Sequence, residues 1–544
     1  MRWLERRGRT GAGMTNHLYY GDNLDVLRES IRDESVDLIY LDPPFNSNAT
    51  YNILFRAPSG EASQAQIEAF EDTWHWNDAA ERAFDDVMQS GNAQAADMLR
   101  ALRSFLRDND VMAYITHISA RMLELHRVLK PTGSIYLHCD PMAGHYLKVM
   151  MDAVFGVVGF RNEISWKRTT AHNDARHRFG DVADKIFFYT KSDNYNFRMQ
   201  YGPYDEEYVR SKYYHKDEKG RAYRLSDLRS PQPRPNLMYD YKGYKPHPNG
   251  WAVSMERMVE LDRLGLLEFP RSKDGRIQQR RYLDERKGMP LGNVWTDIPP
   301  INSMAQERLG YPTQKPLALL ERIISASSNE GDVVLDPFCG CGTTVHAAEK
   351  LKRQWIGIDI THLSISVIEK RLRDAFPGIK FEIHGSPKDL DGARDLAARD
   401  KYQFQWWAVS LVNAAPQNSR KKGADGGIDG HIYFRSGAKA TEKAIVSVKG
   451  GGIGVKDVRE LGNVVDREKA KIGVFISLEE HTQPMVKEAA GAGLYDGPTG
   501  KVPKIQLFTI EELLGGKRPR IPLIERAFKM TAVEDMEEQN ELDL

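Results

Sequence analysis

Residues 333–344 read VVLDPFCGCGTT, an apolar run that ends in an acid and a glycine-rich turn. The apolar run is typical of a buried strand, and the residues after the turn begin a helical pattern. Gly340 and Gly342 allow the backbone to approach a bound molecule closely, and the start of a helix presents free N–H groups to it. The stretch therefore predicts a strand, a ligand-binding turn and a helix within an α/β fold.

A second decisive stretch lies near the start of the chain, where residues 38–45 read LIYLDPPF. It predicts another buried strand, which runs into a turn made rigid by two prolines. Asp42 places a carboxylate at the end of that strand, and Phe45 offers an aromatic ring on which a planar group can stack. Taken alone, either stretch could be an ordinary turn between a strand and a helix.

Together, and in this order, the two stretches resemble the beta class of DNA amino-methyltransferases. The resemblance covers residues 15–380 and implies a Rossmann-like core that uses S-adenosylmethionine. It implies that the target amine donates hydrogen bonds to the Asp42 carboxylate and the Pro43 carbonyl, which draws the nitrogen lone pair out of conjugation. Pro44 stiffens this turn, and Phe45 stacks on a base extruded from the helix.

The same resemblance implies a cofactor site built from both halves of the core. Asp22 ends a short strand, where α/β sheets collect ligand contacts, although Asp is also a good helix N-cap. Asp359 follows the glycine turn at the spacing of about 20 residues that is typical of an acid receiving ribose hydroxyls. Lys315 is expected on the cofactor side, with a DNA phosphate or solvent as alternatives. The full set of expected cofactor residues is Asp22, Lys315, Asp336, Phe338, Gly340, Gly342, Thr343 and Asp359.

The expected reaction is methylation of adenine N6 in double-stranded DNA, within restriction–modification or phage defence. An Asp at the head of Asp-Pro-Pro-Phe favours adenine, because cytosine-N4 members of the class usually carry Ser there. Cytosine N4 is an alternative target. An alternative function is a defence nuclease in which the methyltransferase part only senses DNA. The DNA recognition sequence is not predicted.

The length of 544 residues predicts several domains. The expected parts are a disordered extension (1–14, with Met14 as an alternative start), a catalytic half (15–160), a target-recognition region (161–303), a cofactor half (304–385), a C-terminal domain (400–525) and an acidic tail (526–544). The target-recognition region interleaves aromatic and basic residues, which suit contacts to bases and phosphates. Residues 61–130 read as mainly helical.

The C-terminal domain carries a third pattern. Asp429 precedes the apolar strand 432–434, and Lys449 ends a second strand that begins at Ala444. These residues resemble the Mrr-like branch of the PD-(D/E)xK nucleases, which implies that Asp429 holds Mg²⁺ and that Lys449 supports the nucleophile or the phosphate. Ser447 stands where the second acid belongs, and serine is a poor Mg²⁺ ligand. We therefore expect a restriction-endonuclease-like fold, with cleavage or a plain hairpin turn left open.

Composition narrows the setting. Three cysteines give no disulfide framework and indicate a reducing compartment. The basic N-terminus lacks the apolar core of a signal peptide, and no stretch reaches the length of a membrane span, so we expect a cytoplasmic protein. The net charge is +0, so a DNA-binding protein of this balance must segregate its charge. A homodimer is left open.

Overall fold

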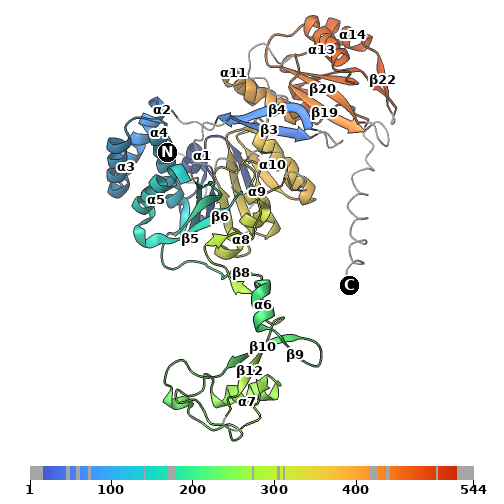
Figure 1. Ribbon diagram of the computed structural model, residues 1–544. Coiled ribbons are helices and arrows are strands. Elements are labelled where there is room, and N and C mark those ends of the chain that lie inside the picture. The colour runs from blue at the N-terminus through green and yellow to red at the C-terminus, as the bar shows by residue number, and fades with distance from the viewer. Residues whose placement is uncertain are drawn as a thin grey trace, which may run out of the picture. The chain divides into compact units, whose positions relative to one another are not determined.

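The computed structural model describes residues 16–44, 50–56, 62–71, 75–139, 141–169, 179–272, 275–302, 305, 307–309, 311, 313–416, 427–435, 441–497 and 500–522. The chain divides into two compact units, one holding residues 1–198 and 293–544 and the other residues 199–292 (Figure 1). Phe45, the extension 1–14 and the tail 526–544 lie outside the described residues.

A nine-stranded sheet forms the centre of the larger unit and joins both predicted halves of the core. Its strands lie in the order β14 (Val294–Trp295), β6 (Phe160–Lys167), β7 (Ala183–Thr190), β5 (Leu129–Cys139), β2 (Val36–Leu41), β15 (Val333–Asp336), β16 (Gln354–Asp359), β1 (Asn16–Tyr20) and β17 (Phe381–His384). The strand β7 runs antiparallel to β5 and β6, while the other pairs are parallel. The two strands that carry the decisive stretches, β2 and β15, are direct neighbours.

Helices cover both faces of this sheet, because successive strand residues point to opposite sides. Ile39 and Leu41 pack into one hydrophobic cluster, whereas Leu38 and Tyr40 pack into the other. In Figure 1 the blue and cyan helices lie on one side of the sheet and the yellow ones on the other. The first group is α1 (Asn23–Ser30), α2 (Asp78–Gln89), α3 (Ala93–Leu106), α4 (Asp110–Val128) and α5 (Pro141–Phe155), and the second is α8 (Leu317–Ser327), α9 (Thr343–Lys350) and α10 (His362–Ala375). The 3₁₀ turn η1 (Val157–Gly159) follows α5.

The prediction that residues 61–130 are mainly helical is confirmed by α2, α3 and α4. One segment differs, because β4 (Ala62–Glu71) is a strand that pairs antiparallel with β3 (Thr50–Arg56). The stretch 62–71 is rich in Ala, Gln and Glu, which favour helices intrinsically. Pairing with β3 overrides that weak local preference.

The smaller unit, residues 199–292, has its own hydrophobic cluster, which includes Tyr241, Trp251 and Met258. It contains β8 (Tyr201–Gly202), α6 (Glu206–Lys212), β9 (His215–Lys216), β10 (Ala222–Asp227), η3 (Pro235–Leu237), α7 (Met255–Arg263), β11 (Leu267–Glu268), β12 (Gln278–Tyr282) and β13 (Met289–Pro290). Its boundaries are narrower than the predicted region 161–303, because β6 and β7 belong to the large sheet.

The chain is held in the larger unit on both sides of this insertion. On the exit side, the Arg198 amide donates to the Ala326 carbonyl at 2.7 Å. On the return side, the Ser165 amide donates to the Asn293 carbonyl at 2.8 Å, just before β14 pairs with β6. The insertion therefore begins and ends at fixed points of the core.

The C-terminal part forms a five-stranded sheet in the order β18 (Ala415–Pro416), β19 (Gly430–Arg435), β20 (Thr441–Lys449), β21 (Ile472–Ser477) and β24 (Ile505–Thr509). The strands β19 and β20 are antiparallel, whereas β20, β21 and β24 are parallel. One cluster packs α11 (Leu390–Arg399), α12 (Lys401–Ser410) and α15 (Ile510–Leu514) against the sheet, and another packs α13 (Val455–Arg467) and α14 (Gln483–Gly491). A small hairpin joins β22 (Leu494–Gly497) to β23 (Gly500–Pro503). Across the described parts of the chain, every helix is too short or too polar to cross a membrane.

Candidate active site

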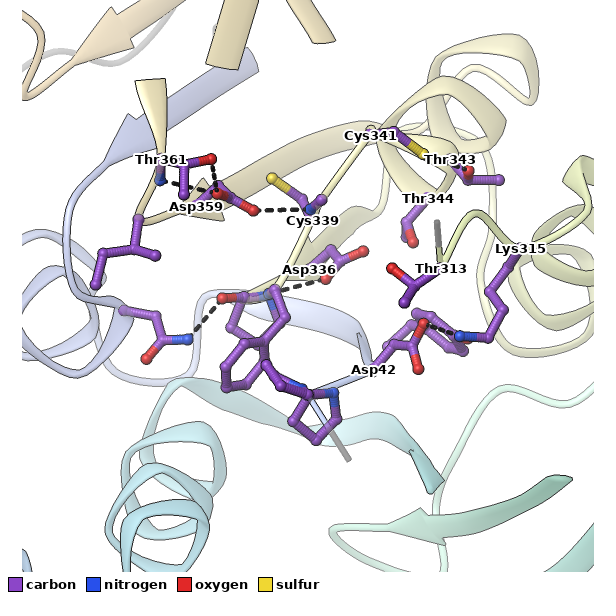
Figure 2. Close-up of a pocket in the computed structure, with 18 of the residues that line it drawn as sticks. Asp42, Thr313, Lys315, Asp336, Cys339, Cys341, Thr343, Thr344, Asp359 and Thr361 are labelled. Atoms are coloured by element: carbon purple, nitrogen blue, oxygen red, sulfur yellow. Dashed lines mark hydrogen bonds and ion pairs between the residues drawn. The ribbon is translucent and has the colours of Figure 1, made fainter. Parts of the chain in front are cut away.

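Three carboxylates gather where neighbouring parallel strands end. Asp42 follows β2, while Asp336 and Asp359 are the last residues of β15 and β16. Parallel neighbours end at the same edge of a sheet, which is where open α/β sheets bind ligands. All three side chains line one cleft of about 310 Å³, within the usual size range of small-molecule sites (Figure 2).

The Asp42 carboxylate is held by a lysine from the distant cofactor half. Lys315 Nζ donates to Asp42 Oδ2, and both side chains are largely buried (Figure 2). The other oxygen, Oδ1, lies 3.9 Å from His138 Nδ1. Lys315 was expected on the cofactor side; it lines the cleft, and its ammonium contacts the predicted catalytic acid. Pro43 and Pro44 also line the cleft.

A buried polar network lies beneath Asp42. The Tyr40 hydroxyl is 2.8 Å from His138 Nδ1, and His138 Nε2 is 3.1 Å from Asp184. Arg168 Nε donates to the other Asp184 oxygen at 2.7 Å. Burial opposes ionisation of Asp184, but the His138 hydrogen bond and the charges of His138 and Arg168 outweigh it and lower the pKa of this carboxyl. His138 and Asp184 are almost fully buried, and neither is among the residues that line the cleft.

The glycine turn provides a cradle on the other side of the cleft. Gly340 has a φ of +49°, and a Cβ there would meet the Tyr311 ring at 3.4 Å. Its amide donates to Asp359 Oδ2 at 2.9 Å. Gly342, with a φ of +76°, is the N-cap of α9, and a Cβ there would lie 2.8 Å from Ile368. The positive φ favours glycine at both positions, and at Gly342 the close packing against Ile368 excludes a side chain as well.

Burial perturbs the acids that border this cradle. It raises the pKa of Asp336 to about 7, and the neighbouring charges of Asp42 and Asp359 act in the same direction. Hydrogen bonds from Thr344 and the Phe338 amide oppose that rise. Burial also raises the pKa of Asp359, whose carboxylate accepts from Thr361 at 2.9 and 3.0 Å. Such crowding of carboxyl groups favours a positively charged ligand.

A chain of hydrogen bonds joins the two halves at the far end of the cleft. Asp22 caps α1 through the Leu24 amide at 2.7 Å and accepts from Arg121 at 2.9 and 3.0 Å. Arg121 Nε also donates to Asn23 Oδ1, and Asn23 Nδ2 donates to the Pro337 carbonyl at 2.7 Å. Arg121 is only 4% exposed. Asp22 is therefore both a helix cap and a cleft residue, so its two predicted roles are compatible.

Most of the predicted cofactor residues line the cleft, namely Asp22, Lys315, Asp336, Phe338, Gly340, Thr343 and Asp359. Gly342 is not among the lining residues, and it is the N-cap residue of α9. Sequence reasoning missed further lining residues, among them Asn23, Arg121, Thr313 and Thr361. Arg121 had a detectable signal, because it falls in the buried stripe of α4 with Ile118 and Leu125.

The C-terminal candidates do not converge in the same way. Asp429 Oδ2 accepts from the Val448 amide at 2.6 Å, and Lys449 Nζ lies 3.9 Å from Asp457 on α13. Ser447 is buried. Among the described residues, Asp429 belongs to no group of three His, Cys, Asp or Glu side chains close enough to share a metal ion. The described geometry therefore gives no support to the predicted Mg²⁺ site.

Family comparisons agree with this division of the chain. Residues 36–370, more than half of the sequence, match the family described as DNA methylase. The chain belongs to the DNA methylase family. Residues 403–515 match a family described as NACHT-associated inactive restriction endonuclease 1. The C-terminal part is thus similar to a family of restriction-endonuclease type that is described as inactive, and its Mrr-like assignment stays a prediction.

Several curated relatives resemble the same region. The type II methyltransferase M.EcaI of Enterobacter cloacae is 27% identical over 66% of this chain and 69% of its own length. The Mod subunit of the type III restriction–modification enzyme StyLTI of Salmonella typhimurium is 28% identical over 61% of this chain and 50% of its own length. The DNA adenine methyltransferase YhdJ of Escherichia coli is 26% identical over 65% of this chain and 82% of its own length.

The cleft suits S-adenosylmethionine, the methyl donor expected of this family. That molecule carries a cationic sulfonium and an ammonium group, and the carboxyls of Asp336, Asp359 and the partly exposed Asp22 offer complementary charge. Gly340 leaves room that a Cβ would fill. Thr361, Thr343 and Thr313 add hydroxyl groups for polar contacts along the walls (Figure 2).

Proposed function

We propose that the protein transfers a methyl group from S-adenosylmethionine to adenine N6 in double-stranded DNA. The observation that carries the proposal is the shared cleft of Asp42 and Gly340, which come from the neighbouring strand ends of β2 and β15. An amine held at Asp42 and a donor held on the glycine turn would occupy one cavity. Proximity of this kind is a large part of catalysis in group transfer.

In this proposal Asp42 orients the target amine. The bound donor supplies an electrophilic methyl group, and the protein supplies hydrogen-bond acceptors. Lys315 holds Asp42 Oδ2, so Oδ1 is the oxygen left to accept from the amine, together with the Pro43 carbonyl. These acceptors direct the nitrogen lone pair away from the base ring. Asp42 also receives the proton that the nitrogen gives up after the methyl group arrives.

The buried network keeps this acceptor in place. His138 stands between Tyr40 and Asp184, with its Nδ1 side facing Asp42. We infer that His138 and Asp184 are positioning residues, since neither lines the cleft and they reach the substrate only through Tyr40 and Asp42. Fixed polar groups next to a reacting centre avoid reorganisation during the reaction.

DNA is the proposed substrate because of both family and charge. The insertion 199–292 holds nineteen Lys and Arg against fourteen Asp and Glu, a net charge of +5 in a chain whose net charge is +0. Such segregation suits phosphate contacts. Adenine is favoured by Asp42 and by the name of the adenine-methylating relative, with cytosine N4 as the alternative. A place in restriction–modification is supported by the name of the StyLTI relative.

For the C-terminal domain we propose a restriction-endonuclease fold that does not cleave DNA. The support is that Asp429 is bound by a backbone amide and that Lys449 faces Asp457. The matching family is itself described as inactive. We therefore expect the whole chain to methylate DNA without cutting it.

The test combines labelled S-adenosylmethionine with mixed-sequence double-stranded DNA and the full-length protein. The expected result is label in the DNA, recovered as N6-methyladenine after digestion to nucleosides. Recovery of 4-methylcytosine alone would replace adenine with cytosine as the target. DNA binding without any transfer of label would refute the enzyme and support a sensor.

A further inference from the structure

An unassigned cluster of potential metal ligands lies at the edge of the large sheet. His17 is on β1, and Glu382 and His384 are on the neighbouring edge strand β17. Their ligand atoms all lie within 4.8 Å of one another, and the described residues contain no other such group of His, Cys, Asp or Glu. None of the three lines the cleft of the proposed reaction.

Strand register brings these side chains together. The strands β1 and β17 are parallel, with His17 opposite Glu382 and Tyr19 opposite His384. Positions 382 and 384 are two residues apart, so their side chains share a face of the sheet. The register therefore points all three ligands to one side, and Tyr19 stacks on the His384 ring at 4.5 Å between centroids.

The distances between the three ligand atoms suit a bound cation better than direct hydrogen bonds between the side chains. His17 Nδ1 and His384 Nε2 are 3.0 Å apart, which one tautomer can satisfy as a hydrogen bond. Glu382 Oε2, however, lies 3.9 Å from His17 Nδ1 and 3.6 Å from His384 Nε2. Both distances exceed hydrogen-bonding range, so the carboxylate faces two imidazoles without bonding to them.

These separations match tetrahedral coordination. Zinc binds imidazole nitrogen at about 2.0–2.1 Å and carboxylate oxygen at about 2.0–2.2 Å, which places neighbouring ligand atoms about 3.3 Å apart. The observed separations of 3.0, 3.6 and 3.9 Å bracket that value. The side chains are 31%, 58% and 31% exposed for His17, Glu382 and His384, so an ion can enter from solvent.

We propose that His17, Glu382 and His384 bind one Zn²⁺ ion, or a similar divalent transition-metal ion, at this sheet edge. Two imidazoles and one carboxylate are the ligand types that Zn²⁺ prefers, whereas Mg²⁺ prefers oxygen ligands alone. Water completes the coordination. The ion bridges β17 to β1, and so fastens the edge strand from which the chain continues to α11. The proposal is independent of the methyltransferase reaction.

The test uses the full-length protein after treatment with EDTA and its removal. Titration with Co²⁺ should give visible absorption bands of tetrahedral or five-coordinate cobalt that saturate at one ion per chain and are displaced by Zn²⁺. His384→Ala and His17→Ala should each weaken binding at least tenfold. Saturating Zn²⁺ should raise the unfolding temperature of the wild type but not of these variants.

The matched control is His75→Ala, which removes an exposed histidine that also pairs with a carboxylate, Asp110, at 3.0 Å. It should leave Co²⁺ binding unchanged. Glu382→Gln keeps the shape of the side chain and removes its charge, so it tests the site if a histidine variant fails to fold. Equal binding by the wild type, His384→Ala and Glu382→Gln would overturn the proposal, as would no saturable binding by the wild type.

Discussion

The cleft of the large sheet and the C-terminal sheet use the same residue types with opposite results. In the cleft, Asp42 and Lys315 come from segments far apart in the sequence and meet as a buried pair. In the C-terminal sheet, Asp429 binds a backbone amide and Lys449 faces Asp457. Lys315 reaches Asp42 from the segment before α8, at the edge where the parallel strands end. Asp429, just before β19, and Lys449, at the end of β20, instead have separate partners. Convergence, rather than residue type, distinguishes the two regions.

The largest effect is expected when Asp42, the acid on which the side chains of the cleft converge, is removed. Asp42→Ala should lower the rate of methyl transfer by about 10³-fold, because the amine loses its charged acceptor. Binding of S-adenosylmethionine, measured by calorimetry, should change little. The control is Asp97→Ala, which removes an exposed carboxylate on α3. A full rate in Asp42→Ala would mean that the cleft is not the reaction centre.

The crowding of acids in the cleft can be tested through pH. The pKa of Asp336 is about 7 in the folded protein and near 4 in an unfolded chain, so the folded state holds a proton that the unfolded state has lost. Stability from this proton is present below the unfolded pKa and is lost as pH rises through 7. Asn cannot ionise, so Asp336→Asn should gain stability relative to the wild type by roughly 3 kcal/mol between pH 5 and pH 8.

Urea unfolding of both proteins at the two pH values, without cofactor, measures this difference. Asp97→Asn serves as the control, because the carboxylate that it replaces is exposed to solvent in the folded protein. If the wild type and Asp336→Asn lose or gain stability in parallel, the carboxyls of the cleft are not crowded as described.

The contact between Lys315 and Asp42 provides another test of convergence in the cleft. Lys315→Ala should reduce the single-turnover methylation rate about 10- to 100-fold, the equivalent of one charge-assisted hydrogen bond. Cofactor affinity should stay unchanged, and Lys315→Arg should restore part of the rate. A large loss of cofactor affinity with an intact rate would instead return Lys315 to the cofactor carboxylate.

The smallest effect is expected in the C-terminal sheet. Asp429→Ala leaves the Val448 amide without its acceptor and should cost about 1 kcal/mol of stability, as measured by urea unfolding. DNA incubated with Mg²⁺ should remain uncut by both the wild type and this variant, and methylation should be unaffected. Cleavage by the wild type that Asp429→Ala abolishes would show that the two regions are alike after all.

Much of the core was predictable because its signals are local. Apolar runs that end in Asp42 and Asp336 predicted strands, and the glycines predicted the turn before α9. The partner of Lys315 was not predictable, because a lysine before a helix has no local feature that selects an acid 273 positions away. The hairpin of β3 and β4 was missed because strand pairing outweighed the helix preference of residues 62–71.

Residues that act through contacts across the sheet were also beyond local reasoning. His138 is a polar residue in an apolar strand sequence, but its link to Asp184 depends on the antiparallel pairing of β5 with β7. The exact limits of the insertion also depended on strand pairing. The sequences of β6 and β7 resemble the variable region that follows them, and only their pairing assigns them to the large sheet.

The fixed ends of the insertion 199–292 bear on how such a protein can diversify. The chain leaves the core beside Ala326 and rejoins it beside Ser165, and neither anchor uses a side chain of the insertion. An exchange of the whole segment between Arg198 and Asn293 would therefore leave the strand register of the core unchanged. If the insertion reads the DNA sequence, as its own sequence predicts, new sequence preferences would arise by recombination of this one segment while the residues of the cleft are inherited unchanged.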